Sequence, residues 1–197
     1  MLAGTQFLSF GEFVLYKGSG SAYNVNSVEP IEVFYNLRTD LDKLQYAAYI
    51  TKIVEDVTNE NETAFNILQL ILNTIYTISE TDSNMDLVIS VFKLRILSLI
   101  GFTPNVKVCT NCGTNENLEY FSVKDNGVKC TACSKQDKSV IHISNATLYA
   151  IRYAIMGEPK KLFSFNIPED ALEELKLVSK VYLDEKLEKS YKFEKII

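Results

Sequence analysis

All four cysteines of this chain stand in two pairs, each with two residues between its members: Cys109 with Cys112, and Cys130 with Cys133. Seventeen residues separate the pairs. This spacing predicts a structural zinc site, because each pair can direct two thiolates at one ion and two pairs complete a tetrahedron. Gly113 follows the second cysteine and relieves crowding where the chain turns back. We therefore expect one zinc ion per chain, bound by these four thiolates.

The residues between the two pairs predict a β-hairpin. Strand-like segments at 118–123 and 128–130 flank a turn at 124–127, and Asn126-Gly127 is a strong hairpin signal because both residues tolerate positive φ. The whole segment is therefore typical of a zinc ribbon. Two disulfides in a secreted domain, or buried free thiols, are the alternatives. Paired cysteines with none elsewhere are not how a disulfide framework is usually spread.

A tetrathiolate site has no open coordination position, so we expect it to organise structure and not to activate water. The single histidine, His142, lacks the H-x-E pattern of zinc deaminases. We interpret it as a strand residue leaving the ribbon, with ligation in place of a cysteine as the alternative. Two acidic pairs, Glu55 with Asp56 and Asp40 with Asp42, are the candidates for an unrecognised enzyme. At these spacings the side chains do not share a helix face, so we expect no enzyme.

Composition and charge limit the class of protein. With 197 residues, of which 47% are hydrophobic, the chain can bury a sizeable core in one or two domains. The formal net charge of −5 does not by itself suggest DNA, because nucleic-acid binders usually carry a basic excess. The apolar run 85–100 is short and is interrupted by Asp86, Lys93 and Arg95, so we expect a buried helix and no membrane partner. The cysteines are reduced and spaced for a metal, and no basic-then-apolar leader sequence stands at Met1, so we expect a cytoplasmic protein.

Hydrophobic periodicity predicts an α+β fold that is mainly α. We expect two strands at 10–16 and 23–28, the second ended by Glu29-Pro30. Five helices follow: one capped by Thr39 and reaching 57, one from Asn61 or Thr63 to 78, one at 85–100 closed by Gly101, one capped by Ser144 and reaching 156, and one from about Pro168 to 187. The second is apolar nearly all round from Phe65 to Ile78, which favours burial between neighbouring helices. Five aromatic residues at helix positions are expected in the core: Tyr46, Tyr49, Phe65, Tyr76 and Phe92.

Several segments in this order carry a resemblance to a known family. They are LSFGEFVLYKG (8–18) followed by SVE (27–29), DLDKLQYAAY (40–49), FKLRIL (92–97) leading into GFTP (101–104), the two cysteine pairs, and SYKF (190–193). Together they resemble the RecO family of bacterial DNA repair proteins. The resemblance implies the C-terminal part of an OB-fold at 1–36, a helical domain at 37–104 and 142–197, and a zinc ribbon at 105–141. The opening strands of the family's OB-fold would precede Met1.

The resemblance also implies a function. RecO-like proteins bind and anneal single-stranded DNA, including strands coated by single-strand-binding protein, and act with RecR to load the RecA recombinase; this implies a bacterial, nucleoid-associated protein. As DNA contacts we expect the basic side chains at and near the ribbon: Lys129, Lys135, Lys138, Arg152, Lys160 and Lys161. For the acidic, apolar-tipped tail of single-strand-binding protein the candidates are Lys93, Arg95 and Arg152. The alternative is a zinc-ribbon module that binds proteins without direct DNA binding.

Overall fold

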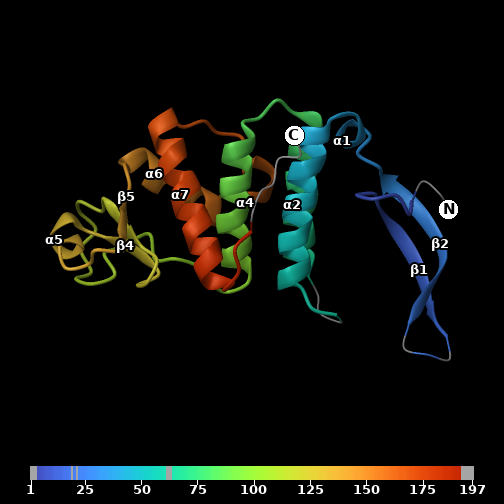
Figure 1. Cartoon of the computed structure of the whole chain (residues 1–197), viewed down its shortest axis with the longest axis horizontal. Helices are drawn as coiled ribbons and strands as arrows, with labels where there is room; N and C mark the ends of the chain where they lie inside the picture. The colour runs from blue at the N-terminus through green and yellow to red at the C-terminus, as the bar shows by residue number, and fades with distance from the viewer. Residues whose placement is uncertain (1–3, 19, 21, 61–63, 192–197) are drawn as a thin grey trace.

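The computed structural model describes residues 4–18, 20, 22–60 and 64–191, and it is α+β and mainly helical, as predicted. A β-hairpin, a helical body and a small sheet with long loops follow one another across the molecule (Figure 1). The elements are β1 (Phe10–Lys17), β2 (Tyr23–Glu32), α1 (Asn36–Thr39), α2 (Leu41–Val57), α3 (Phe65–Glu80), α4 (Met85–Leu99), β3 (Tyr120–Ser122), β4 (Gly127–Lys129), α5 (Thr131–Ser134), β5 (Val140–His142), α6 (Asn145–Met156), η1 (Pro159–Lys161) and α7 (Glu169–Lys186).

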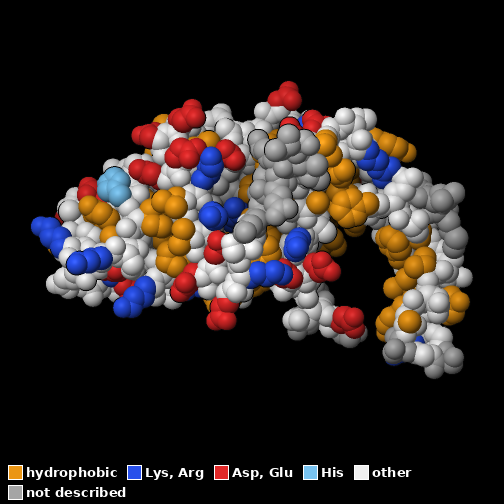
Figure 2. Space-filling view, viewed as in Figure 1, with side chains coloured by type: hydrophobic (Ala, Val, Ile, Leu, Met, Phe, Trp, Pro, Cys, Tyr) orange, Lys and Arg blue, Asp and Glu red, His pale blue; other side chains and the backbone are white. Residues whose placement is uncertain are grey.

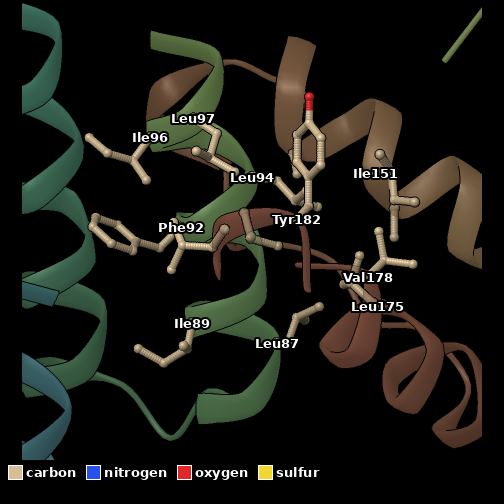
Figure 3. Close-up of a cluster of buried hydrophobic side chains, with 14 of the residues drawn as sticks. Leu87, Ile89, Phe92, Leu94, Ile96, Leu97, Ile151, Leu175, Val178 and Tyr182 are labelled. Atoms are coloured by element: carbon tan, nitrogen blue, oxygen red, sulfur yellow. The ribbon is translucent and has the colours of Figure 1, made fainter. Parts of the chain in front are cut away.

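Helix α4 is the centre of the body, and its apolar sequence explains why. It packs against α2, α3, α6 and α7, so nearly every side of it meets another helix. Figure 3 shows Phe92 directed away from α7, and Leu94 directed toward Tyr182 of α7. All three side chains are buried. The buried helix expected at 85–100 is therefore confirmed. Among the described residues, no helix combines the length and the apolar character needed to cross a membrane.

Local signals set several helix ends. The side chain of Asn84 caps α4, and Gly101 ends it with a φ of 99°. The N–H of Phe102 donates to the carbonyl of Leu97 at 2.8 Å, which closes a Schellman turn around that glycine. Ser144 caps α6 through the N–H of Thr147, as predicted.

One predicted cap was wrong by a single residue. Asp40, not Thr39, caps α2, and its carboxylate accepts from the N–H of Lys43. Thr39 instead ends the short helix α1, where its hydroxyl donates to the carbonyl of Asn36. The predicted starts of α3 at Asn61 or Thr63 lie outside the described residues.

Helix α3 packs between α2, α4 and η1, as expected, but one side of it remains open. Phe65 is 67% exposed and Tyr76 is 57% exposed, although both were expected in the core. Phe92 is buried as expected, and Tyr46 and Tyr49 are half-buried. The difference arises because α2, α4 and η1 cover the inner side of α3 and leave its outer side open.

The hairpin of β1 and β2 exposes most of its side chains, and Figure 2 shows hydrophobic groups along it. Strand β2 continues to Glu32, so the prediction that Glu29-Pro30 ends it was wrong. Pro30 lies opposite Gly11, next to a register shift. In a two-stranded sheet each strand is an edge, so a residue without an N–H is tolerated there.

Candidate metal centre and nucleic-acid interface

The ribbon is a three-stranded sheet in which β3 pairs with both β4 and β5. The predicted hairpin forms, but its turn differs: Asn126 has a φ of 52°, whereas Gly127 already belongs to β4. A Cβ at Gly127 would lie 2.3 Å from the carbonyl oxygen of Asn105, so glycine lets the incoming chain approach the strand closely. Phe121 of β3 packs edge-on against Tyr182 of α7, with ring centroids 5.4 Å apart. This contact joins the ribbon to the helical body.

The four cysteine sulfurs converge beside the end of β4, which Cys130 follows directly. Their Sγ atoms all lie within 4.8 Å of one another, and those of Cys112 and Cys130 are 3.7 Å apart. A tetrahedron with metal–sulfur bonds of about 2.3 Å has edges of about 3.8 Å, so the donor set fits a metal ion. The same separation is far longer than a disulfide bond of about 2.05 Å. The four cysteines are therefore not disulfide-bonded, and they can hold a metal ion.

The surroundings of Cys109 favour its thiolate form, whereas at Cys112 a backbone N–H donor is outweighed by the neighbouring cysteines, which raise the pKa to about 11. Burial raises the pKa of Cys109, but backbone N–H donors of neighbouring residues outweigh it and bring the pKa down to about 6. The thiolate is the form that binds metals. Asn111 donates its side-chain N–H to the Sγ of Cys133 at 3.3 Å, and Gly113 adopts a φ of 75° where the chain turns back. The second feature agrees with the predicted role of this glycine.

His142 lies in β5, as predicted, and not among the cysteines. Its Nδ1 is 3.6 Å from a carboxylate oxygen of Glu174, and its ring meets Tyr120 edge-on. Glu174 also accepts from the backbone N–H of Ser144 at 2.7 Å, so it ties α7 to the end of the ribbon. Burial raises the pKa of Glu174, but the N–H of Ser144 and the hydroxyl of Thr147 outweigh it and hold the pKa below its usual value.

The prediction of Lys129 as a DNA contact is corrected by its burial. Its ammonium lies 2.5 Å from a carboxylate oxygen of Asp125 and 2.8 Å from one of Asp137, and only 7% of the residue is exposed. Burial lowers the pKa of Lys129, but the two carboxylates outweigh it and raise the pKa. Lys129 therefore supports the ribbon from inside and cannot reach a phosphate in this arrangement.

The other predicted cations are placed differently. Lys135 and Lys138 are exposed on the ribbon, whose outer end carries basic side chains in Figure 2. Lys160 and Lys161 are exposed on η1. Arg152 is half-buried, and its Nε donates to the carbonyl of Val106 at 2.8 Å, which anchors α6 to the start of the ribbon.

Lys93 and Arg95 face different parts of the body. Lys93 lines a cavity of about 400 Å³ between α2, α4 and α7, with its Nζ 5.3 Å from the centroid of the Tyr49 ring. Burial lowers the pKa of Lys93 to about 8. Arg95 donates to the carbonyl of Ile155 and lines a separate cavity of about 160 Å³. The structure does not bring the three proposed docking residues together.

The acidic pairs considered for catalysis take part in structural contacts. The carboxylate of Asp56 accepts from the ammonium of Lys189 at 2.5 Å and from the hydroxyl of Tyr191 at 2.8 Å. These two hydrogen bonds lower the pKa of Asp56. They attach the chain after α7 to the end of α2, and Asp40 caps the start of the same helix.

Sequence reasoning missed one surface, an aromatic group on α6. Tyr149 and Tyr153 are stacked, and Tyr153 also contacts Phe165. The four-residue spacing of the two tyrosines was the available signal, because such residues are neighbours on a helix.

The chain is similar to known proteins over most of its length. A family model described as "Recombination protein O C terminal" matches residues 38–194. A "DNA repair protein RecO" from Acetivibrio thermocellus is 42% identical over 192 residues, which are 97% of this chain and 76% of that protein. Proteins with the same description from Alkaliphilus metalliredigens and Bacillus subtilis are 35% and 27% identical, over 93% and 89% of this chain and 74% and 68% of those proteins.

Proposed function

This chain belongs to the RecO family of DNA repair proteins, and on that premise we propose that it acts as a recombination mediator. In this role it binds and anneals single-stranded DNA and, with RecR, helps to load the RecA recombinase. Such a mediator breaks no covalent bond and works in the cytoplasm, at the nucleoid. The observation that carries the proposal is the 42% identity to a relative over 97% of the chain.

The charges of the structure support a limited DNA surface. With a net charge of −5, binding must depend on local groups of exposed cations, such as Lys135 and Lys138 on the ribbon and Lys160 and Lys161 on η1. Each phosphate contact releases counterions, so affinity falls as salt rises. Because few phosphate contacts are expected, the affinity should depend only weakly on the salt concentration.

The test is binding and annealing measured together. We expect the protein to bind a labelled oligo(dT) with an affinity that falls with salt, and to accelerate pairing of two complementary strands. The double variant Lys135→Ala/Lys138→Ala should reduce the salt slope by roughly two. Lys52→Ala, an exposed lysine on α2, is the matched control. Binding that ignores salt, or no annealing, contradicts the proposal.

We propose zinc as the ion of the four-cysteine centre, one per chain and structural. Four thiolates are the donor set of structural zinc sites, and they leave no position for water or substrate. When bound, the ion holds the two cysteine turns together. The ribbon residues then keep Lys135 and Lys138 in place on the outer surface.

A second candidate function is docking of a protein partner, with or without direct DNA binding. The cavity lined by Tyr49, Ile89, Lys93 and Lys180 has apolar walls and two cations, which suits the acidic, apolar-tipped tail of single-strand-binding protein. Lys176 is less available, because its ammonium is 2.9 Å from a carboxylate oxygen of Asp86.

A peptide titration tests the docking proposal. We expect a tail peptide to shift NMR signals of α4 and α7 around the cavity, and Lys93→Ala/Lys180→Ala to weaken its binding. Lys52→Ala serves again as the control. An absence of shifts around Lys93 removes this candidate and leaves the DNA proposal standing.

A further inference from the structure

Two stacked tyrosines lie on α6, Tyr149 exposed and Tyr153 half-buried. The ring centroids of Tyr149 and Tyr153 are 6.3 Å apart and the ring planes differ by 26°. Tyr149 is 61% exposed, so one face of its ring is open to a planar ligand while the other is backed by Tyr153. Exposure of the apolar ring surface to water is unfavourable, so the ring is suited to stack on a planar ligand.

The inner ring is fixed on several sides. The hydroxyl of Tyr153 donates to the carbonyl of Lys161 at 2.9 Å, and its ring centroid is 4.7 Å from that of Phe165. A Cβ at Gly157 would lie 3.3 Å from the same ring, so the glycine backbone packs beside it. Tyr149 therefore rests on a support that is already in place before any ligand arrives.

Two lysines lie in the segment to which the hydroxyl of Tyr153 is hydrogen-bonded. Lys161, whose carbonyl accepts from Tyr153, and its neighbour Lys160 are both exposed. The Nζ of Lys161 is 3.4 Å from a carboxylate oxygen of Glu158, and both side chains are largely open to water. A surface ion pair of this kind is weak and can be replaced by a phosphate.

We propose that Tyr149 and Tyr153, together with Lys160 and Lys161, form a base-stacking site for single-stranded DNA. An unpaired base lies on the ring of Tyr149, and the adjoining phosphates lie at the two lysines. Stacking on aromatic rings tolerates any base, as sequence-independent binding requires. The inference rests on the proposed function, for which it names a contact surface.

Substitutions separate the rings from the charges. In the full chain, Tyr149→Ala should weaken oligo(dT) binding about tenfold at every salt concentration and leave the salt slope unchanged, because stacking releases no counterions. Lys160→Ala/Lys161→Ala should instead reduce the slope by roughly two. Tyr35→Ala, at an exposed tyrosine beside α1 and far from α6 in Figure 1, is the matched control and should bind like the original chain.

A direct signal is available because the chain contains no tryptophan. Tyr149→Trp should keep the affinity within about threefold of the original and give an indole emission that oligo(dT) quenches. Glu158→Gln should tighten binding, since it releases Lys161.

The outcomes distinguish this inference from the function on which it rests. If the original chain binds DNA with a salt dependence and Tyr149→Ala binds equally well, the stacking site is wrong and the proposed function stands. An indole emission that DNA leaves unchanged has the same meaning. If the original chain shows no salt-dependent binding, the proposed function fails and the stacking site fails with it.

Discussion

Cys112 is the exposed member of the four-cysteine cluster, so its substitution disturbs the metal centre with little effect on packing. We expect the purified, reduced protein to contain about one zinc ion per chain, and Cys112→Ser to lose it, because three thiolates do not complete the tetrahedron. The helical body should keep its circular dichroism, since its core is formed by other residues. Metal analysis and far-ultraviolet spectra check both points.

Asn115→Ser, at an exposed position between Cys112 and β3, is the control and should retain its zinc. Less than about half an equivalent of zinc in the original protein would argue against the site.

Lys93 gives a prediction that depends on pH. Burial lowers its folded pKa to about 8 from an ordinary 10.5, so between these values the folded state binds fewer protons than the unfolded state. The free energy of unfolding should therefore rise with pH across this window, and the cost of burying the charge is fully present below pH 8. We expect Lys93→Met to raise Tm by about 2–4 °C at pH 7, and by less at pH 10.

Lys180→Met, at an exposed lysine on the rim of the same cavity, should leave Tm nearly unchanged at both pH values. A gain for Lys93→Met that is equal at pH 7 and pH 10 would show that packing, and not the buried charge, is responsible.

At the residue scale, sequence spacing predicted contacts between residues that lie near one another in the chain. The clustering of the four cysteines could be predicted because both gaps are short and two such pairs suit a tetrahedral metal site. The role of Lys129 could not, because its burial depends on Asp125 and Asp137 meeting it after the ribbon has folded. The pairing of Tyr149 and Tyr153 was accessible from spacing, whereas their exposure depends on which helices leave α6 uncovered.

At the scale of elements, Gly101 at the end of α4 and Gly20 between β1 and β2 form a matched pair of glycines. Gly101 has a φ of 99° and an added Cβ would meet nothing within 4 Å, so Gly101→Ala tests backbone strain alone. We expect a loss of about 1 kcal/mol in the free energy of unfolding. Gly20→Ala is the control, because that position is equally open and its φ is outside the left-handed range. Urea unfolding measures both, and equal stability of the two variants would contradict the assigned strain.

Element boundaries were predictable where a side chain or a glycine acts on its own neighbours. Ser144 and Gly101 are examples, since each forms or permits hydrogen bonds within one helical turn. The outer face of α3 was not predictable, because Phe65 and Tyr76 have the composition of core residues and only the arrangement of other helices exposes them. The extension of β2 beyond Pro30 likewise depends on its pairing with β1.

At the scale of the whole molecule, the hairpin of β1 and β2 stands out because, in the described part of the chain, its backbone groups are paired on one side of each strand only. Within the described residues its sheet has two strands only, so both edges present unpaired backbone groups and can join another chain. We expect concentration-dependent self-association. The paired positions Leu15 and Val25 are both exposed, and Leu15→Lys/Val25→Lys should reduce the association.

Sedimentation velocity over a range of concentrations measures this, with Leu177→Lys on α7 as the control for added charge at another exposed apolar site. If the hairpin variant still associates and the Leu177 variant does not, the contact between copies lies on α7 and not on the hairpin.

The order of the chain also has a consequence for synthesis on the ribosome. Helix α7, against which α4 packs, begins at Glu169, 70 residues after α4 ends at Leu99, and the whole ribbon is translated in between. At about 5–20 residues per second this takes several seconds. The cysteine turns can therefore bind a metal ion before α7 has been synthesised, while the side of α4 that α7 covers is still exposed. Nascent chains stalled after Ser144 has left the ribosome, and before α7 has emerged, should then yield a metal-loaded ribbon beside an open helical body, which ribosome-associated chaperones would be expected to shield.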